Sequence, residues 1–249
     1  MKISFVIPAY NEENYIVDCL KTLVLRIKNS GISAEIIVVN NASTDQTKQM
    51  AFQFPKVQVL DETRKGLSRA RQAGYKASSG DLIANVDADT RLPEGWIETV
   101  IAEFSKNKKL VALSGPQVFY DVPKRVHYWT RVFYMFTFLG YFLNRFVFHT
   151  SSFLQGGNFV IRRSALKKIG GYNEEFDFYG EDADIAHRLH KVGQVKFTLK
   201  FPIFASGRRI LAEGKFTMAF RYFLNYFWTI FLGRPYTQQS LDVRFAKRK

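Results

Sequence analysis

Short continuous apolar runs alternate with segments of helical periodicity through the first half of this 249-residue chain, and this alternation is what most constrains its fold. Uninterrupted runs of this kind are typical of strands that are buried on both faces of a sheet. The connections are short, so we expect an α/β architecture: a Rossmann-like, mostly parallel sheet with helices on both faces. Strands are expected at residues 3–7, 35–39, 56–60, 81–86 and 110–115, and the first of these is an uninterrupted apolar run.

The starts of the helices are predicted from the signals that usually begin a helix. Serine, threonine and acidic residues often cap the first turn of a helix. A glycine can end the preceding segment just before a helix, and proline is tolerated in the first helical turn. The expected starts are residue 11 or 12, residue 43 or 44, residue 67 and residue 93, and a last strand is expected at 195–199.

Polar loops follow several of the apolar runs, with PAYNEE after the first, NNASTD after the second and DADT after the fourth. The carboxyl ends of parallel strands meet at one edge of a sheet, where ligands bind, so these loops are expected to converge there. Asp87 and Asp89 are separated only by Ala88, and strand spacing would point both side chains to the same side. Burying two carboxylates is costly, so a positive partner is required.

The charge balance indicates anionic partners. The formal net charge is +14, which suits nucleic acid, an acidic lipid surface or phosphorylated small molecules. Cys19 stands alone, which excludes an internal disulfide framework and suits a reducing cytoplasm. The first residues, MKISFVIPAY, carry too short an apolar run for a signal peptide, so we expect a cytoplasmic protein.

Two segments of the second half, around residues 119–153 and 215–235, are dense in aromatic residues and interrupted by basic ones. Their apolar stretches are shorter than the roughly 20 residues that span a bilayer. Aromatic rings interleaved with basic residues favour helices that lie peripherally on the inner face of an anionic membrane. The alternative is that these helices pack on the sheet or on a second subunit of a homo-oligomer.

Six motifs in order resemble those of family-2 glycosyltransferases of the GT-A fold. They are FVIPAYNEE, VVNNASTD, GLSRARQAG, DLIANVDADTRLP, GGNFVIRR and YGEDADIAHRL, and the resemblance covers about residues 1–200. It implies a GT-A domain over residues 1–205, with a nucleotide-binding half to about residue 115 and an acceptor half from about 116. Residues 206–249 would then form an aromatic and basic helical extension.

The resemblance implies a metal-dependent, inverting transfer of a sugar from a nucleotide-diphosphate sugar to a hydroxyl of a carbohydrate or lipid-linked acceptor, in glycan or cell-envelope synthesis. Mg2+ or Mn2+ would be the cofactor, since these ions prefer carboxylate and phosphate oxygens. Asp89 would be the metal ligand, and Asp87 would contact the metal or the ribose. The ion would then supply the missing positive partner. The alternative is that both acids only cap the turn before Pro93.

The same resemblance places the nucleotide over the first loops. NNASTD departs from the family pattern, which has Asp at one or both positions of Asn40 and Asn41, so UDP is favoured over other nucleotides without being fixed. Each of three residues also has a purely structural interpretation. Tyr10 could be an aromatic residue of the core, Glu12 an acid that the helix dipole favours at a helix N-terminus, and Arg71 a solvated helix residue. The residues implied in donor binding are Pro8, Ala9, Tyr10, Glu12, Asn41, Gly66, Arg71, Asp87, Asn158, Arg208 and Arg209.

The pair Glu181 and Asp182 matches the family's catalytic acids, with Asp182 as the general base and Glu181 as its partner. Asp184 is a weaker candidate, because acids at a helix N-terminus are also explained by the helix dipole. Asn158, after two glycines, would frame the donor sugar. Arg208 and Arg209 would clamp the departing diphosphate or form a basic surface pair.

Other classes of function explain less of the sequence. A nucleic-acid-binding module would account for the charge, but four acids at one rim would repel a phosphate backbone. A sugar nucleotidyltransferase would need a glycine-rich basic loop near the N-terminus, and none is present. A non-catalytic scaffold that binds membrane would not need both acidic motifs. His187 and His190 lack a third ligand, so they are interpreted as structural or surface residues.

Overall fold

The computed structural model describes residues 1–143, 153–238 and 241–243. Its main sheet has the strand order β3-β2-β1-β4-β8-β6-β9. Every pair in this sheet is parallel except those that β8 makes with β4 and β6. The expected α/β architecture is therefore confirmed, with one reversed strand in its centre. The strands are β1 (Ile3–Ala9), β2 (Ala34–Asn40), β3 (Val57–Asp61), β4 (Leu82–Val86), β6 (Leu110–Ser114), β8 (Asn158–Arg162) and β9 (Gln194–Phe197).

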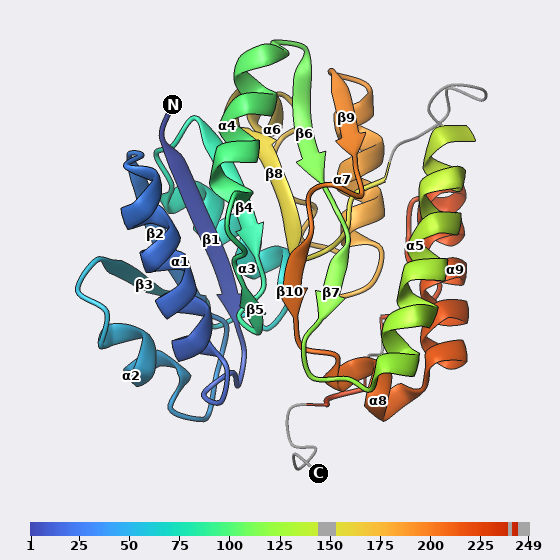
Figure 1. The fold of residues 1–249 in the computed structure, drawn as a ribbon, viewed down its shortest axis with the longest axis horizontal. Helices are drawn as coiled ribbons and strands as arrows, with labels where there is room; N and C mark the ends of the chain where they lie inside the picture. The colour runs from blue at the N-terminus through green and yellow to red at the C-terminus, as the bar shows by residue number, and fades with distance from the viewer. Residues whose placement is uncertain (144–152, 239–240, 244–249) are drawn as a thin grey trace.

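A second, three-stranded sheet lies at the carboxyl edge of the first and was not foreseen in the sequence (Figure 1). It joins β5 (Thr90–Arg91), β10 (Ile203–Ala205) and β7 (Gln117–Phe119). The backbone N–H of Ser206 donates to the carbonyl of Asp89 at 3.2 Å, just beyond this sheet. The small sheet therefore brings the start of the C-terminal region against the loop that carries the paired acids.

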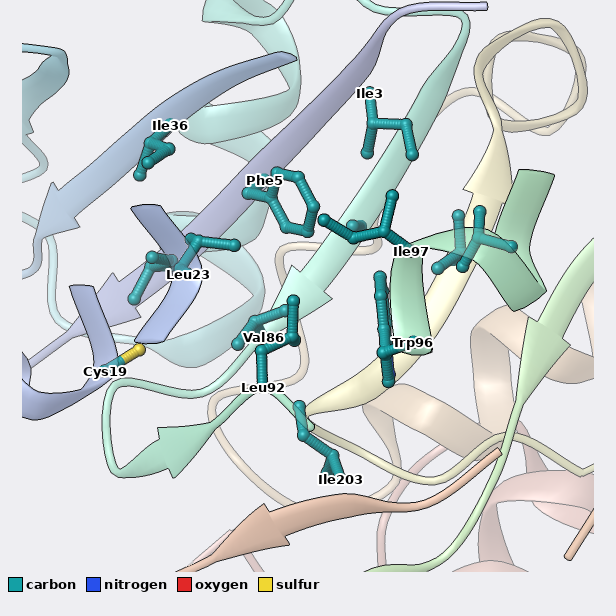
Figure 2. Packing of buried hydrophobic residues seen from close by; sticks show 14 of the residues in the cluster. Ile3, Phe5, Cys19, Leu23, Ile36, Val86, Leu92, Trp96, Ile97 and Ile203 are labelled. Atoms are coloured by element: carbon teal, nitrogen blue, oxygen red, sulfur yellow. The ribbon is translucent and has the colours of Figure 1, made fainter. Parts of the chain in front are cut away.

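Helices cover both faces of the main sheet. Alternate residues of β1 serve the two faces: Phe5 packs among residues of α1 and α4, and Val6 packs among residues of α3, α6 and α7. Figure 2 shows Phe5 in the same cluster as Leu23 and Trp96, and the ring centroids of Phe5 and Trp96 are 6.0 Å apart. The helices are α1 (Ile16–Ser30), α2 (Thr47–Phe52), α3 (Leu67–Ala77), α4 (Trp96–Lys106), α6 (Arg163–Lys168) and α7 (Glu181–His190).

Three of the predicted helix starts were wrong, and only the start at residue 67 is confirmed. Helix α1 begins at Ile16 because the preceding residues join two loops: the Asn11 side chain accepts from the Thr44 backbone at 2.8 Å, and the Glu12 backbone donates to Thr47 Oγ1 at 2.7 Å. Thr44 is thereby kept out of α2. Helix α4 begins after Gly95, whose φ of +77° no regular helix allows.

The described parts of the aromatic segments form two long helices on the flank of the main sheet, α5 (Lys124–Leu143) and α9 (Lys215–Leu232), with the short α8 (Arg208–Glu213) before α9 (Figure 1). Residues 144–152 of the first segment lie outside the described residues. Helix α5 packs on the end of β9 through Tyr134 and Tyr141, which both contact the ring of Phe197. Many other aromatic rings of these helices are exposed. Within the described residues, no helix combines the length and apolar character needed to cross a bilayer.

Candidate active site

One cavity of about 1080 Å³ brings together the acidic and basic residues at the carboxyl edge of the sheet. Its wall includes residues from the loops after β1, β2 and β4, from the start of α7 and from α8. Side chains far apart in the sequence therefore share one space. Of the residues predicted to form the site, those that line it are Pro8, Ala9, Tyr10, Glu12, Asn41, Gly66, Arg71, Asp87, Asp89, Glu181, Asp182, Arg208 and Arg209.

Arg71 is a buried counter-ion for two of the acids. Its side chain is completely buried, with Nη2 3.4 Å from Asp87 Oδ1 and Nη1 in an ion pair with Glu181 Oε1. Burial would lower the pKa of Arg71, but the two carboxylates outweigh it and keep the guanidinium charged. Arg71 is therefore not the solvated helix residue that one interpretation expected, and it links the loop after β4 to the start of α7.

Arg208 is the counter-ion of Asp89, as Arg71 is for Asp87 and Glu181. Its Nη2 lies 3.0 Å from Asp89 Oδ2 and 2.5 Å from Glu12 Oε1. Burial raises the pKa of Asp89, and the Arg208 guanidinium opposes that rise. Asp87 and Asp89 follow the end of β4 at Val86, line the same cavity and pair with different arginines. The positive partners of the two acids are thus arginines of the chain itself.

The start of α7 holds two acids whose pKa values are raised. Burial raises the pKa of Glu181 to about 7 against the opposing effect of Arg71. Burial also raises the pKa of Asp182, although the backbone N–H groups of Ala183 and Gly156 donate to its carboxylate at 2.9 and 3.3 Å. An acid with a raised pKa is a better proton acceptor near neutral pH. Asp184 instead bonds Arg188 at 2.6 Å and does not line the cavity.

The loop after β2 explains why an asparagine occupies position 41. Asn41 Nδ2 donates to the carbonyls of Glu62 and Arg64 at 3.0 and 2.9 Å, and its Oδ1 accepts from the Gly66 backbone at 2.9 Å. A carboxylate could not make the two donations. Asn41 therefore fixes the loop that carries Gly66 on the cavity wall.

Asn158 is the one predicted site residue that the structure does not bring to the cavity wall. It is completely buried, and its Nδ2 donates to the carbonyls of Gly115, Pro116 and Phe201 at 3.0, 3.3 and 2.8 Å. Its Oδ1 accepts from Trp96 Nε1 at 3.1 Å. The side chain therefore holds backbone segments together beneath the site.

Asp121 is a positioning residue that the sequence did not reveal. Its carboxylate accepts from Ser206 Oγ and from the Gly207 backbone, both at 2.6 Å, immediately before Arg208. Arg209 follows, with Nη1 2.8 Å from Glu213 Oε1 and its guanidinium 4.5 Å from the Phe178 ring centroid. Asp121 sits in no recognisable motif, so only the fold shows that it orients the basic pair.

Gly157 should tolerate no side chain. Its φ is +74°, and a Cβ at this position would overlap the carboxylate of Asp87. Gly157→Ala is expected to displace Asp87 and to destabilise the protein by about 1–3 kcal/mol, the typical strain of such a backbone position. Gly156→Ala is the matched control, since its Cβ would meet the nearest atoms at an ordinary 3.5 Å. Urea unfolding would check both variants, and equal stabilities would contradict this account of the loop.

A divalent metal fits these residues only together with a substrate. Among the described residues, no cluster of three or more His, Cys, Asp or Glu side chains is arranged to hold an ion. Mg2+ commonly binds through one or two carboxylates with substrate phosphates completing its shell. Asp89 and Asp87 line the cavity and offer the oxygen ligands that such an ion prefers. The donor set therefore suits an ion that arrives with a diphosphate.

Comparison with known proteins identifies related sequences. A model described as Glycosyl transferase family 2 matches residues 4–170, and one described as the N-terminal domain of galactosyltransferase matches residues 144–207. Probable glycosyltransferase YdaM of Bacillus subtilis is 28% identical over 77% of this chain and 47% of that protein. Dolichol-phosphate mannosyltransferase of Pyrococcus furiosus is 37% identical over 47% of this chain and 34% of that protein. The chain thus spans less than half the length of these curated relatives.

Solved structures share the fold at low sequence identity. S. aureus TarS in complex with UDP-GlcNAc superposes with a TM-score of 0.64 at 18% identity, over 96% of this chain and 68% of that one. The mannosyltransferase PcManGT of Pyrobaculum calidifontis, in complex with GDP-Man and Mn2+, gives a TM-score of 0.64 at 17% identity, over 93% of this chain and 63% of that one.

Proposed function

The chain belongs to glycosyl transferase family 2 and has the GT-A fold, and from this premise we propose that it is an inverting, metal-dependent transferase that uses a nucleotide-diphosphate sugar. Family membership supports glycosyl transfer as the reaction class. The observation that carries the finer proposal is the cavity that unites Asp182 with Asp87, Asp89 and Arg208. It offers a base for an acceptor and charged groups for a diphosphate in one space.

Asp182 acts as the general base in this proposal. It takes the proton of the acceptor hydroxyl while that oxygen bonds to the anomeric carbon. The bond from this carbon to the diphosphate oxygen breaks, and its electron pair leaves with the diphosphate. Arg208 and Arg209 line the same cavity and neutralise the charge that develops there. A Mg2+ or Mn2+ ion held by Asp89, with Asp87 beside it, would add positive charge at the same oxygens.

UDP is the proposed nucleotide, with Tyr10, Glu12 and Asn41 beside its base and ribose. Tyr10 offers a ring on the cavity wall, and Lys65 Nζ lies 3.9 Å from its centroid. Two structural neighbours support a uridine nucleotide, S. aureus TarS with UDP-GlcNAc and GalNAc-T7 with UDP, GalNAc and Mn2+. The acid Glu12 already bonds Arg208, so ribose binding and the position of α8 would be coupled.

The proposed acceptor is a lipid-linked or carbohydrate hydroxyl in glycan or cell-envelope synthesis, and the proposed location is the cytoplasmic face of a membrane. The exposed rings of α5 and α9 support a peripheral contact with an anionic lipid surface. The relative named as a dolichol-phosphate mannosyltransferase supports a lipid-linked acceptor.

Thermal unfolding with nucleoside diphosphates tests the donor site. UDP with Mn2+, at about a hundred times its dissociation constant, should stabilise the protein by about 2.7 kcal/mol, which raises Tm by roughly 5–10 °C. Asp89→Asn should lose the Mn2+-dependent part of this shift. Asp18→Asn is the control, because Asp18 forms an exposed ion pair with Arg91. No Mn2+-dependent shift of the wild type with UDP, GDP, dTDP or CDP would overturn the proposal.

A further inference from the structure

The cavity that holds the acids extends beyond them into a space between α5 and α9. Both helices begin at the same end of the molecule, where the Trp129 and Phe216 rings contact each other with centroids 6.3 Å apart (Figure 1). We name the part of the cavity between the helices the aromatic groove. Its aromatic wall includes Trp129, Phe133, Phe136, Phe216, Phe223 and Phe227.

The wall of the aromatic groove suits hydrocarbon better than sugar. Thr130 and Thr137 donate their hydroxyls to backbone carbonyls of α5, at 2.9 and 3.0 Å. The Asn225 amide donates to the Arg221 carbonyl and accepts from the Thr237 backbone, at 2.9 and 3.1 Å. These polar groups are engaged within the protein, whereas a bound sugar needs partners for its hydroxyls. Phenylalanine rings dominate the remaining wall, which favours an apolar ligand.

The groove reaches the proposed base. Tyr134 of α5 and Tyr222 of α9 both line the cavity. Burial raises the pKa of each tyrosine, and the nearby Asp182 carboxylate raises both further. Tyr134 Oη donates to Gln155 Oε1 at 3.1 Å, and the backbone N–H of the next residue, Gly156, donates to Asp182 at 3.3 Å. A ligand in the groove could therefore present its head to this carboxylate.

The charge around the groove is positive. The sequences of α5 and α9 contain no Asp or Glu, and they include Lys124, Arg125, Arg131, Lys215 and Arg221. Lys215 lines the cavity with its Nζ 4.2 Å from the Trp129 ring centroid, and it forms no ion pair with any carboxylate among the described residues. A cation in this position complements a phosphate.

We propose that the aromatic groove binds the hydrocarbon chain of a phosphate-bearing lipid acceptor, whose head lies in the same cavity within reach of Asp182 and Lys215. This inference rests on the proposed transfer reaction and names the substrate class of its acceptor side. A flat bilayer or a second copy of the chain would instead cover the outward apolar side chains equally, including Met135 and Phe220, which do not line the cavity. Continuity with Asp182 distinguishes the groove from those surfaces.

Binding of farnesyl phosphate, geranyl phosphate and inorganic phosphate, measured by calorimetry below the concentration at which the lipids form micelles, tests the groove. Each buried CH2 contributes about fourfold in affinity, so farnesyl phosphate should bind at least about tenfold more tightly than geranyl phosphate. Inorganic phosphate should bind weakest. Equal affinities for the three probes would overturn the proposal and would point to a phosphate site alone.

Matched variants separate the groove from the outer surface. Phe133→Ser and Phe223→Ser, whose rings are 44% and 57% exposed and line the groove, should each weaken farnesyl phosphate binding about tenfold. Met135→Ser and Phe220→Ser, which are 59% and 64% exposed on the same helices, should leave it unchanged. Equal losses in both pairs would overturn the proposal in favour of a bilayer contact. The proposal would also be overturned, in favour of a second copy of the chain, if the groove variants kept lipid binding but lost self-association in sedimentation.

The stabilisation by UDP with Mn2+ is measured on the same samples. If it is present in the wild type while farnesyl phosphate does not bind, the acceptor inference fails and the donor proposal stands. If farnesyl phosphate binds and no nucleotide does, the donor proposal fails instead. The variants should keep the nucleotide-dependent shift, which shows that they are folded.

Discussion

Asp182→Asn is expected to reduce sugar transfer about a thousandfold while nucleotide binding is kept. The amide has the same shape as the carboxylate, and its one oxygen can still accept from the backbone N–H of either Ala183 or Gly156. It cannot take the proton of an acceptor hydroxyl, and general-base catalysis contributes about 10²–10⁴-fold to a rate. Single-turnover transfer from a labelled donor, with donor affinity measured separately, checks this result.

The pH dependence provides a second readout of Asp182. Burial raises the pKa of this carboxyl, and the group acts as a base only after losing its proton. The transfer rate of the wild type should therefore rise with pH as Asp182 ionises, and this rise should be missing in Asp182→Asn. Asp184→Asn is the control, since Asp184 bonds Arg188 outside the cavity. A loss of activity in Asp184→Asn as large as in Asp182→Asn would contradict the assignment.

Arg71→Met is expected to destabilise the protein by about 3–5 kcal/mol, which lowers Tm by roughly 10 °C. Methionine can fill part of the buried space, but Asp87 and Glu181 lose their shared counter-ion. The loss should shrink toward pH 5, because Glu181, whose pKa burial raises to about 7 even beside Arg71, then becomes neutral. Urea unfolding at pH 5 and pH 8 would measure both effects.

Arg69→Met is the matched control for this experiment. Arg69 lies two residues earlier on α3 and pairs with Asp177 at 2.9 Å in a partly exposed ion pair. Such pairs contribute about 0–1 kcal/mol, so this variant should unfold almost as the wild type does. Similar midpoints for Arg71→Met and Arg69→Met would show that the buried arginine does not stabilise the fold.

The strands of the first half of the chain could be predicted because they are short segments rich in apolar residues. Ile36, Ile37, Val38 and Val39 are all buried in β2, as a strand covered on both faces requires. The antiparallel direction of β8 and the small sheet could not be predicted, since strand direction depends on the path of the chain between strands. The helix starts failed where Asn11 uses its side chain to join two loops.

Most residues predicted for the candidate site line one cavity, but the sequence did not reveal the contacts between them. Local motifs place Asp87 and Asp89 at the rim, yet their arginine partners come from α3 and α8. Asp121 lies in no motif at all and acts only through the backbone before Arg208. Long-range contacts of this kind depend on tertiary packing, which the sequence does not encode at any fixed spacing. The division of the chain at residue 205 stays a prediction.

The hydrogen bonds of Asn158 restrict motion of the chain beneath the cavity. Because its amide ties the Trp96 indole to three backbone carbonyls, Gly157 cannot shift without disturbing the interior that Figure 2 shows around Trp96. Local opening is cheapest where few buried contacts must break. The segment around Gly157 is therefore expected to stay rigid, and the local opening that admits or releases a ligand is expected on the side of α8 and α9.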